Sequence, residues 1–152
     1  MNAALEFQDV DILFCREQGR KGARAIRDAL ARLDAGSSRE EISAACGIVV
    51  GVAGASLSIA PGEICVMMGL SGSGKSTLLR AANGLTAVTR GRVLVDDATA
   101  PIDVGHCSTQ SLRRLRRERI AMVFQQFGLL PWRTVADNVG LGLELRGEPT
   151  AE

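Results

Sequence analysis

Aromatic residues are scarce in this sequence, which has no tyrosine, one tryptophan and four phenylalanines among its 152 residues. It also has a single histidine, and its four cysteines lie far apart with no C-x-x-C pair. Such spacing predicts neither a metal site nor a disulfide-stapled miniprotein, and it is typical of small buried thiols in a reducing compartment. The net charge is only +1, so no overall field attracts nucleic acid or anionic lipid.

A run without charged residues extends from Ile42 to Gly62 and is long enough to cross a bilayer. Glycines, serines and Pro61 interrupt this run, and apolar and polar residues alternate between Ala55 and Ile59. Alternation indicates a half-buried strand. We therefore expect two strands, 48–52 and 55–60, joined by a glycine turn. The N-terminus shows no secretory signal, which makes the cytosol the default compartment.

The most specific motif is a glycine-rich stretch that fits the phosphate-binding pattern G-x-x-x-x-G-K-[ST]. Its residues are Gly69, Leu70, Ser71, Gly72, Ser73, Gly74, Lys75, Ser76 and Thr77. The glycines allow backbone N–H groups to approach a polyphosphate, Lys75 can neutralise the β- and γ-phosphates, and the Ser76 hydroxyl can reach Mg²⁺. A dinucleotide fingerprint is excluded because Thr77 stands where the third glycine should fall.

The neighbouring residues support this interpretation. The apolar run 63–68 predicts a buried parallel strand before the loop, and 75–82 predicts a helix after it, with Asn83-Gly84 as its stop signal. Another apolar run, 120–124, predicts a central parallel strand that ends at Gln125. Because ligands sit at the carboxyl ends of parallel strands, Gln125 is expected beside the phosphates. An ordinary loop glutamine is the alternative.

The remaining segments divide into helices and short strands. Residues 1–14 give no clear signal, 21–33 and 38–46 predict helices, and 92–95 predicts a strand. Helices are also expected from Ser108 or Thr109 and over 135–145, the last burying three apolar side chains, Val135, Val139 and Leu143. The predicted fold class is α/β, a P-loop NTPase core with antiparallel strands. The expected domains are a helical N-terminal extension, 1–47, and a nucleotide-binding part, 48–152.

The helix after Ser108 is strongly basic, with five arginines in seven residues: Arg113, Arg114, Arg116, Arg117 and Arg119. A nucleic-acid patch would be supported by interleaved aromatics or a high overall pI, and neither is present. The apolar Leu112 and Leu115 indicate one packed face. We therefore predict a solvated charged surface and no nucleic-acid partner.

Taken together, four stretches in this order and spacing resemble the ATP-binding subunit of ABC transporters. They are 68–80, 91–93, 119–126 and 134–138. Within that family the chain looks most like the importer branch for glycine betaine, proline or choline. The resemblance implies ATP and Mg²⁺ as ligands, 69–77 as the Walker A loop, Ser76 and Gln125 as Mg²⁺ contacts, and Gln125 as the Q-loop glutamine.

The resemblance also implies partners and a location. These are a transmembrane permease contacted near residues 126–132, a second ATP-binding subunit, and a peripheral position on the cytoplasmic face of the membrane. Phe127, Leu129, Leu130 and Trp132 suit such a surface, although core packing is an alternative.

The sequence departs from the family pattern in two respects. It has no counterpart of the signature sequence, the Walker B aspartate, the catalytic glutamate or the switch histidine, so we expect an N-terminal part that binds ATP without hydrolysing it. The family often stacks adenine on an aromatic before the loop, but nothing aromatic lies between Phe14 and Phe124. A small P-loop kinase and a non-catalytic module that docks a membrane partner are the alternative functions.

Overall fold

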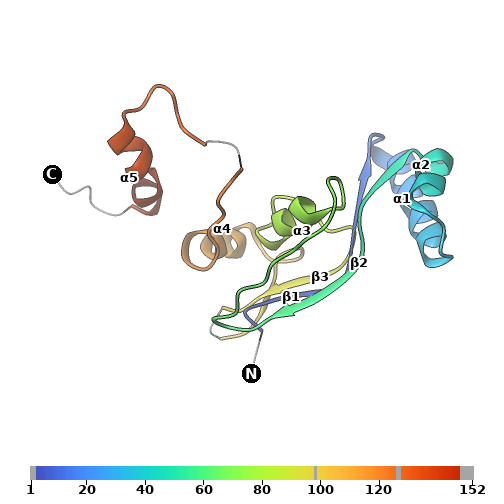
Figure 1. The fold of residues 1–152 in the computed structure, drawn as a ribbon, viewed down its shortest axis with the longest axis horizontal. Helices are drawn as coiled ribbons and strands as arrows, with labels where there is room; N and C mark the ends of the chain where they lie inside the picture. The colour runs from blue at the N-terminus through green and yellow to red at the C-terminus, as the bar shows by residue number, and fades with distance from the viewer. Residues whose placement is uncertain (1–2, 98, 126–127, 148–152) are drawn as a thin grey trace.

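A computed structural model describes residues 3–97, 99–125 and 128–147. Its centre is an antiparallel four-stranded sheet with the strand order β2-β1-β3-β4 (Figure 1). The strands are β1 (Leu5–Cys15), β2 (Ile48–Ile59), β3 (Arg90–Val95) and β4 (Ile102–Asp103). The N-terminal residues that gave no clear sequence signal therefore form the strand that holds β2 and β3 together.

Strand β1 is irregular because its ladders shift register near Asp9. Asp9 has a positive φ of 46°, and its backbone N–H and carboxylate both bind the Ser56 hydroxyl, at 3.0 and 2.8 Å. The facing residue of β3 is Gly91, where a Cβ would lie 2.3 Å from the Asp9 carbonyl oxygen. Only glycine allows the two strands to approach this closely. The bulge breaks the apolar alternation of β1, which explains why the sequence gave no strand signal there.

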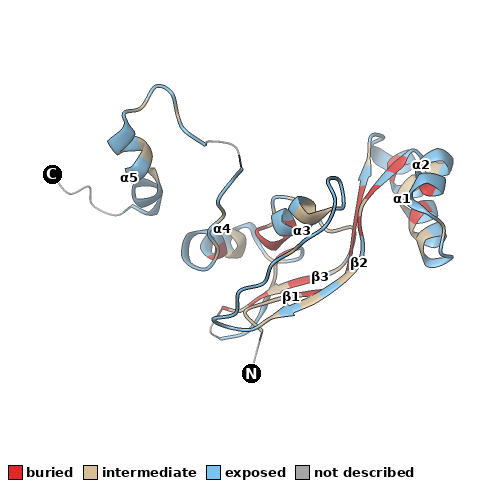
Figure 2. Cartoon of the chain, in the orientation of Figure 1, coloured by how far each residue is buried: buried red, intermediate tan, exposed pale blue. Residues whose placement is uncertain are grey.

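Two separate apolar clusters form the core (Figure 2). The larger lies between the sheet, α3 (Lys75–Ala82) and α4 (Thr109–Glu118), and Val10, Ile12, Val93 and Leu115 are fully buried in it. The smaller joins the far end of β1 and β2 to α1 (Gly19–Asp34) and α2 (Arg39–Cys46). The helical part of the expected 1–47 extension is thus confined to residues 19–46, since β1 belongs to the sheet.

Local capping signals place the helices well. Ser38 and Glu41 form the expected capping box of α2, and Gly47 ends that helix with a left-handed φ of 64°. Ser108 caps α4 by accepting from the Ser111 N–H at 3.1 Å. Thr134 and Asp137 form the capping box of α5 (Val135–Arg146). The last helix differs from expectation in one respect, because Val135, Val139 and Leu143 are exposed rather than buried.

A buried carboxylate connects α1 to the sheet. Asp11 of β1, 1% exposed, accepts from the Gly54 N–H at 2.7 Å and from Arg90 Nε at 2.6 Å. Arg90 also forms two hydrogen bonds to the Asp34 carboxylate, at 2.7 and 2.8 Å. These bonds from Arg90 lower the pKa of Asp34, and the two carboxylates raise that of Arg90. The network fixes the end of α1 against β1 and β3.

The strand predictions need three corrections. Residues 48–59 form one strand, not two, because the positive φ of Gly54 kinks the chain without reversing it. The runs 63–68 and 120–124 join no ladder in the described part of the chain, although both were expected to be buried parallel strands. A buried strand needs hydrogen-bonded neighbours and cover on both faces. Lacking these among the described residues, the two runs expose Val66 (71%) and Val123 (94%).

The cysteines are less buried than expected. Cys65 is exposed, and the thiols of Cys15, Cys46 and Cys107 are partly covered and free. The residues that the structure describes contain no cluster suited to a metal ion. Within the same residues no helix has the length and apolarity to span a bilayer, and most of the uncharged run 42–62 lies in β2.

Candidate functional site: a phosphate-binding loop and its cavity

Helix α3 begins directly at the end of the glycine-rich loop (Figure 1). Its N-cap is Gly74, which has a positive φ of 98° and no side chain to cap the helix. The first N–H groups of an α-helix have no acceptor within the helix, and the helix dipole adds partial positive charge there. The donors of Lys75, Ser76 and Thr77 therefore suit an anion.

Gly74 is also essential for packing. A Cβ at this position would lie 2.3 Å from the carbonyl oxygen of Gly51 in β2, so the loop can approach the strand only with glycine here. By contrast, a Cβ at Gly72 would contact nothing within 4 Å, although its φ of 78° is also left-handed. Gly74 is thus needed both for the close approach to β2 and for its left-handed φ, whereas Gly72 is needed for its left-handed φ alone.

The Lys75 ammonium group folds back over the loop. Its Nζ donates to the carbonyl oxygens of Gly69 and Leu70, both at 2.8 Å, and to the Ser73 hydroxyl at 3.2 Å. These contacts place one positive charge within the curve of the loop. A cation there and a ring of backbone donors form a favourable environment for a phosphate chain.

A cavity of about 450 Å³ opens in front of the loop. It is lined by Phe14, Val49, Val50, Gly51, Ser71, Gly72, Ser73, Gly74, Lys75, Ser76, Thr77 and Gln125. The structure therefore brings Gln125 to the phosphate loop across a long sequence separation. The Ser76 hydroxyl and the Gln125 amide are oxygen donors of the kind that Mg²⁺ accepts. Their role as Mg²⁺ contacts stays a prediction.

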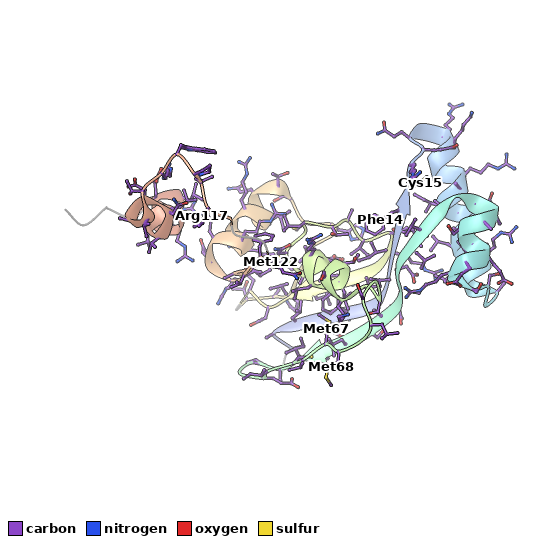
Figure 3. All side chains as sticks on the ribbon, turned by 45° about the horizontal axis from the view of Figure 1, so that its top comes forward. Phe14, Cys15, Met67, Met68, Arg117 and Met122 are labelled. Carbon is purple, nitrogen blue, oxygen red and sulfur yellow. The ribbon has the colours of Figure 1, made fainter. Side chains whose placement is uncertain are left out.

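Two contacts guide the segment before Gln125. The Ile120 N–H donates to the Leu115 carbonyl at the end of α4, at 2.9 Å. Asn83 Nδ2, just after α3, lies 3.0 Å from Met122 Sδ (Figure 3). The segment 120–125 therefore runs from α4 past the end of α3 toward the cavity, even though it pairs with no described strand.

Phe14 is a residue of the site that the sequence did not reveal. It lies near the end of β1, between α3 and the pair α1–α2, and its ring is about half exposed (Figure 3). In the sequence, Phe14 marks only the start of a long stretch without aromatic residues, and no motif gives it a role in the site. Recognising that 5–15 is a strand paired with β2 would have placed it, since β2 touches the loop at Gly51.

The arginines of α4 mostly contact the protein itself. Arg114 pairs with the buried carboxylate of Asp97, and Arg119 Nε lies 3.5 Å from the same group. Arg116 Nε donates to the Asn83 carbonyl at 2.8 Å, and Arg117 donates to the Arg146 carbonyl at the end of α5. These contacts agree with a structural surface. The absence of a nucleic-acid partner stays a prediction.

The segment after Gln125 presents apolar side chains at the surface. Gln126 and Phe127 lie outside the described residues. Beyond them, Asn138 of α5 holds Leu130, accepting its N–H at 2.7 Å and donating to its carbonyl at 3.1 Å. These two hydrogen bonds brace the loop at Leu130, and the nearby side chain of Trp132 is 76% exposed. An exposed tryptophan on a braced loop is typical of an interaction site.

The glycine-rich loop, the helix that starts at its last glycine and the cavity before them define a P-loop nucleotide-binding protein. The family model described as "ABC transporter" matches residues 52–152. The chain belongs to the ABC transporter family. The predicted resemblance and the predicted fold class are both confirmed by this match and by the solved structure described below.

Curated relatives are ATP-binding proteins of transport systems. The chain is 50% identical over 115 residues to the glycine betaine/proline betaine transport ATP-binding protein ProV of Escherichia coli, covering 76% of the chain and 28% of ProV. It is 44% identical over 124 residues to the glycine betaine transport ATP-binding protein OpuAA of Bacillus subtilis, covering 82% and 29%. It therefore spans less than a third of the length of these two relatives.

A solved structure shares the fold. The ATP-binding cassette MJ0796, described as a dimer in a post-hydrolysis state bound to ADP and Pi, matches with a TM-score of 0.68 at 26% identity. The match covers 97% of this chain and 50% of that one.

Proposed function

We propose that this chain binds Mg²⁺–ATP as part of the ATP-binding subunit of an importer, which couples ATP hydrolysis to uptake of a quaternary amine such as glycine betaine. The observation that carries the proposal is the cavity in which the phosphate loop, Phe14 and Gln125 meet. Its volume is within the usual range for small-molecule sites. The names of ProV and OpuAA support the substrate class.

Each residue in the cavity has a role in this proposal. The N–H groups of 74–77 and Lys75 hold the phosphate chain, while Ser76 and Gln125 supply oxygens to Mg²⁺. Phe14 offers its exposed ring face to the adenine, because an aromatic face stacks well on a nucleobase. The bound metal would neutralise phosphate charge. The fit rests on the donor set described above.

The described lining of the cavity contains no carboxylate and no histidine. Phosphoryl transfer depends on residues that position the attacking water and the metal. We therefore expect the chain alone to bind the nucleotide without turning it over, and hydrolysis to require residues that the cavity does not contain.

The exposed surface around Leu129 and Trp132 supports a partner. We assign it to the permease subunit at the cytoplasmic face of the membrane, where the chain acts as a peripheral component. A second ATP-binding subunit is the other partner, and the dimeric structure of MJ0796 supports it.

The test is calorimetric titration of the purified chain with Mg²⁺–ATP, with a phosphate-release assay in parallel. Lys75→Ala removes the cation of the loop and should abolish measurable binding, while neither protein releases phosphate above background. Trp132→Ala is the matched control, because this side chain lies outside the cavity, and its affinity should equal that of the wild type.

Failure of the wild type to bind would contradict the proposal. A specific observation then favours the second candidate, a docking module that does not use nucleotide, because Trp132 is exposed on a braced loop. In that case capture of the permease would be lost in Trp132→Ala and retained in Lys75→Ala.

A further inference from the structure

Arg39, the first residue of α2, lines a second cavity beside the phosphate loop. This cavity has a volume of about 380 Å³ and lies further along β2, beside Val52 and Ala53. Its lining includes Gly69 and the three residues Ser73 to Lys75 of the loop. Arg39 therefore shares this cavity with Ser73 to Lys75, which also line the phosphate cavity.

A third cavity, of about 480 Å³, lies between α2 and β2. It is lined by Arg39, Glu40, Ser43 and Ala44 of α2 together with Val49 and Val50 of β2. Val49 and Val50 also line the phosphate cavity. In the described sheet β2 is an edge strand, and its residues 49–53 line the cavities that it shares with α2 and with the loop. Helix α2 thus packs beside the strand that carries one wall of the nucleotide cavity, and none of its residues lines that cavity itself.

Helix α2 is a firm support for this side chain. Its start is fixed by the capping box of Ser38 and Glu41, with hydrogen bonds of 3.2 and 2.8 Å. Its middle is anchored by Ile42, which is fully buried in the smaller core cluster. An arginine at the first position of such a helix is therefore held at a defined distance from the sheet edge.

The position of Arg39 is unfavourable for the helix itself. A cation in the first turn opposes the helix dipole, whereas anions such as Glu40 and Glu41 stabilise it. Glu41 is engaged in the capping box, and within the described ranges no carboxylate forms an ion pair with Arg39. The Arg39 side chain is exposed and lines two of the cavities.

We propose that Arg39 is a second cation for the phosphate chain of the bound nucleoside triphosphate, reaching it from α2 while Lys75 acts from within the loop. The inference rests on the proposed nucleotide site and adds a contact from the helical segment to it. A guanidinium suits this role because its paired N–H groups match two phosphate oxygens. Through this contact the bound nucleotide also links α2 to the phosphate loop.

The test compares Mg²⁺–ATP and inorganic tripolyphosphate by calorimetry for the wild type, Arg39→Ala and Arg39→Lys. Loss of a charge-assisted contact should weaken both ligands about tenfold in Arg39→Ala. Arg39→Lys keeps the charge and should recover part of the loss. Arg27→Ala is the matched control, since it removes the same charge from an exposed site on α1 that lines none of the three cavities.

Equal affinities of Arg39→Ala and the wild type for ATP would overturn the inference. So would a loss for ATP without a loss for tripolyphosphate, because the contact would then be to ribose or base. Lys75→Ala separates this failure from that of the proposed function. If Lys75→Ala abolishes binding while Arg39→Ala leaves it intact, the proposed nucleotide site is supported and only the role of Arg39 is contradicted. If the wild type binds neither ligand, both fail.

Discussion

At the scale of single residues, the site depends on a backbone contact between the phosphate loop and β2. Gly74 has a left-handed φ and lies so close to the Gly51 carbonyl that no Cβ fits between them. Gly72 has a similar φ but open space around it. An alanine at Gly72 would therefore meet only the strain of a left-handed φ, whereas an alanine at Gly74 would also clash with the Gly51 carbonyl oxygen.

We predict that Gly74→Ala displaces the loop from β2 and weakens Mg²⁺–ATP binding by at least tenfold. The reason is that the obstructing atom is a backbone oxygen, which cannot rotate away as a flexible side chain can. Gly72→Ala should lower the free energy of unfolding by only about 1 kcal/mol, the usual cost of a left-handed alanine. Calorimetric titration and thermal melts of both variants measure the difference.

If the two alanine variants bound ATP equally well, the approach of Gly74 to Gly51 would have no part in shaping the site. A larger loss in Gly72→Ala than in Gly74→Ala would contradict the assignment of the close contact itself.

At the scale of elements, similar capping boxes begin two helices with very different packing. Helix α2 buries Ile42 in a core cluster, whereas α5 has no buried residue. The stability of α5 thus depends on its cap, on the hydrogen bond between Asn138 and Leu130 and on the ion pair of Arg133 with Glu144. The hydrogen bond from Arg133 lowers the pKa of Glu144. Short helices without a packed face are marginal in water.

We predict that Thr134→Ala and Ser38→Ala have opposite signatures, although each removes a cap worth about 1 kcal/mol. Thr134→Ala should reduce helical circular dichroism at low temperature while leaving the main melting transition unchanged. Ser38→Ala should keep the helical signal and lower the melting temperature, because α2 is coupled to the core.

A lowered main transition in Thr134→Ala would show that α5 packs on the remainder of the fold. An unchanged transition in Ser38→Ala would show that the smaller core cluster contributes little to the cooperative unit.

The elements that sequence reasoning predicted correctly are those with local signals. Helix α3 has the expected bounds, because the loop glycine and Asn83 mark its ends, and Gly47 ends α2 as expected. The strands were harder, since pairing partners lie far apart in sequence. The apolar run 63–68 has the composition of a buried strand, but composition does not supply a neighbour. The phosphate loop was recognised from its own residues. Phe14 and Arg39 lie far from it in sequence, and only the folding of β1, β2 and α2 brings them into cavities that the loop also lines.

At the scale of the whole molecule, apolar surface is concentrated away from the sheet. The segments 63–70, 120–125 and 128–132 and helix α5 are mostly exposed (Figure 2). Among their exposed apolar side chains are Val66, Val123, Leu129 and Trp132. Contiguous apolar surface and strand-like runs without pairing partners favour association between chains.

We predict that the double substitution Val66→Lys and Val123→Lys raises solubility without changing the melting temperature. Both side chains are largely exposed, so added charge opposes association and removes no core contact. Changes at such positions usually alter the free energy of unfolding by within about 0.5 kcal/mol. Light scattering over a range of concentrations and thermal melts check both parts.

Val93→Lys is the control, since Val93 is fully buried in the larger core cluster and its replacement should prevent folding. A clear drop in melting temperature of the double variant would contradict the prediction and show that Val66 or Val123 is covered in solution.

The central place of β1 has a consequence for translation. Leu5 pairs with Ile59 on one side and with Val95 on the other, so β1 leaves the ribosome before either of its neighbours and waits for both. Until Val95 emerges, one edge of β1 and the apolar Phe7, Val10 and Ile12 stay open to chaperones or to other nascent chains. The yield of folded protein should therefore depend on how fast the ribosome travels from the phosphate loop to β3.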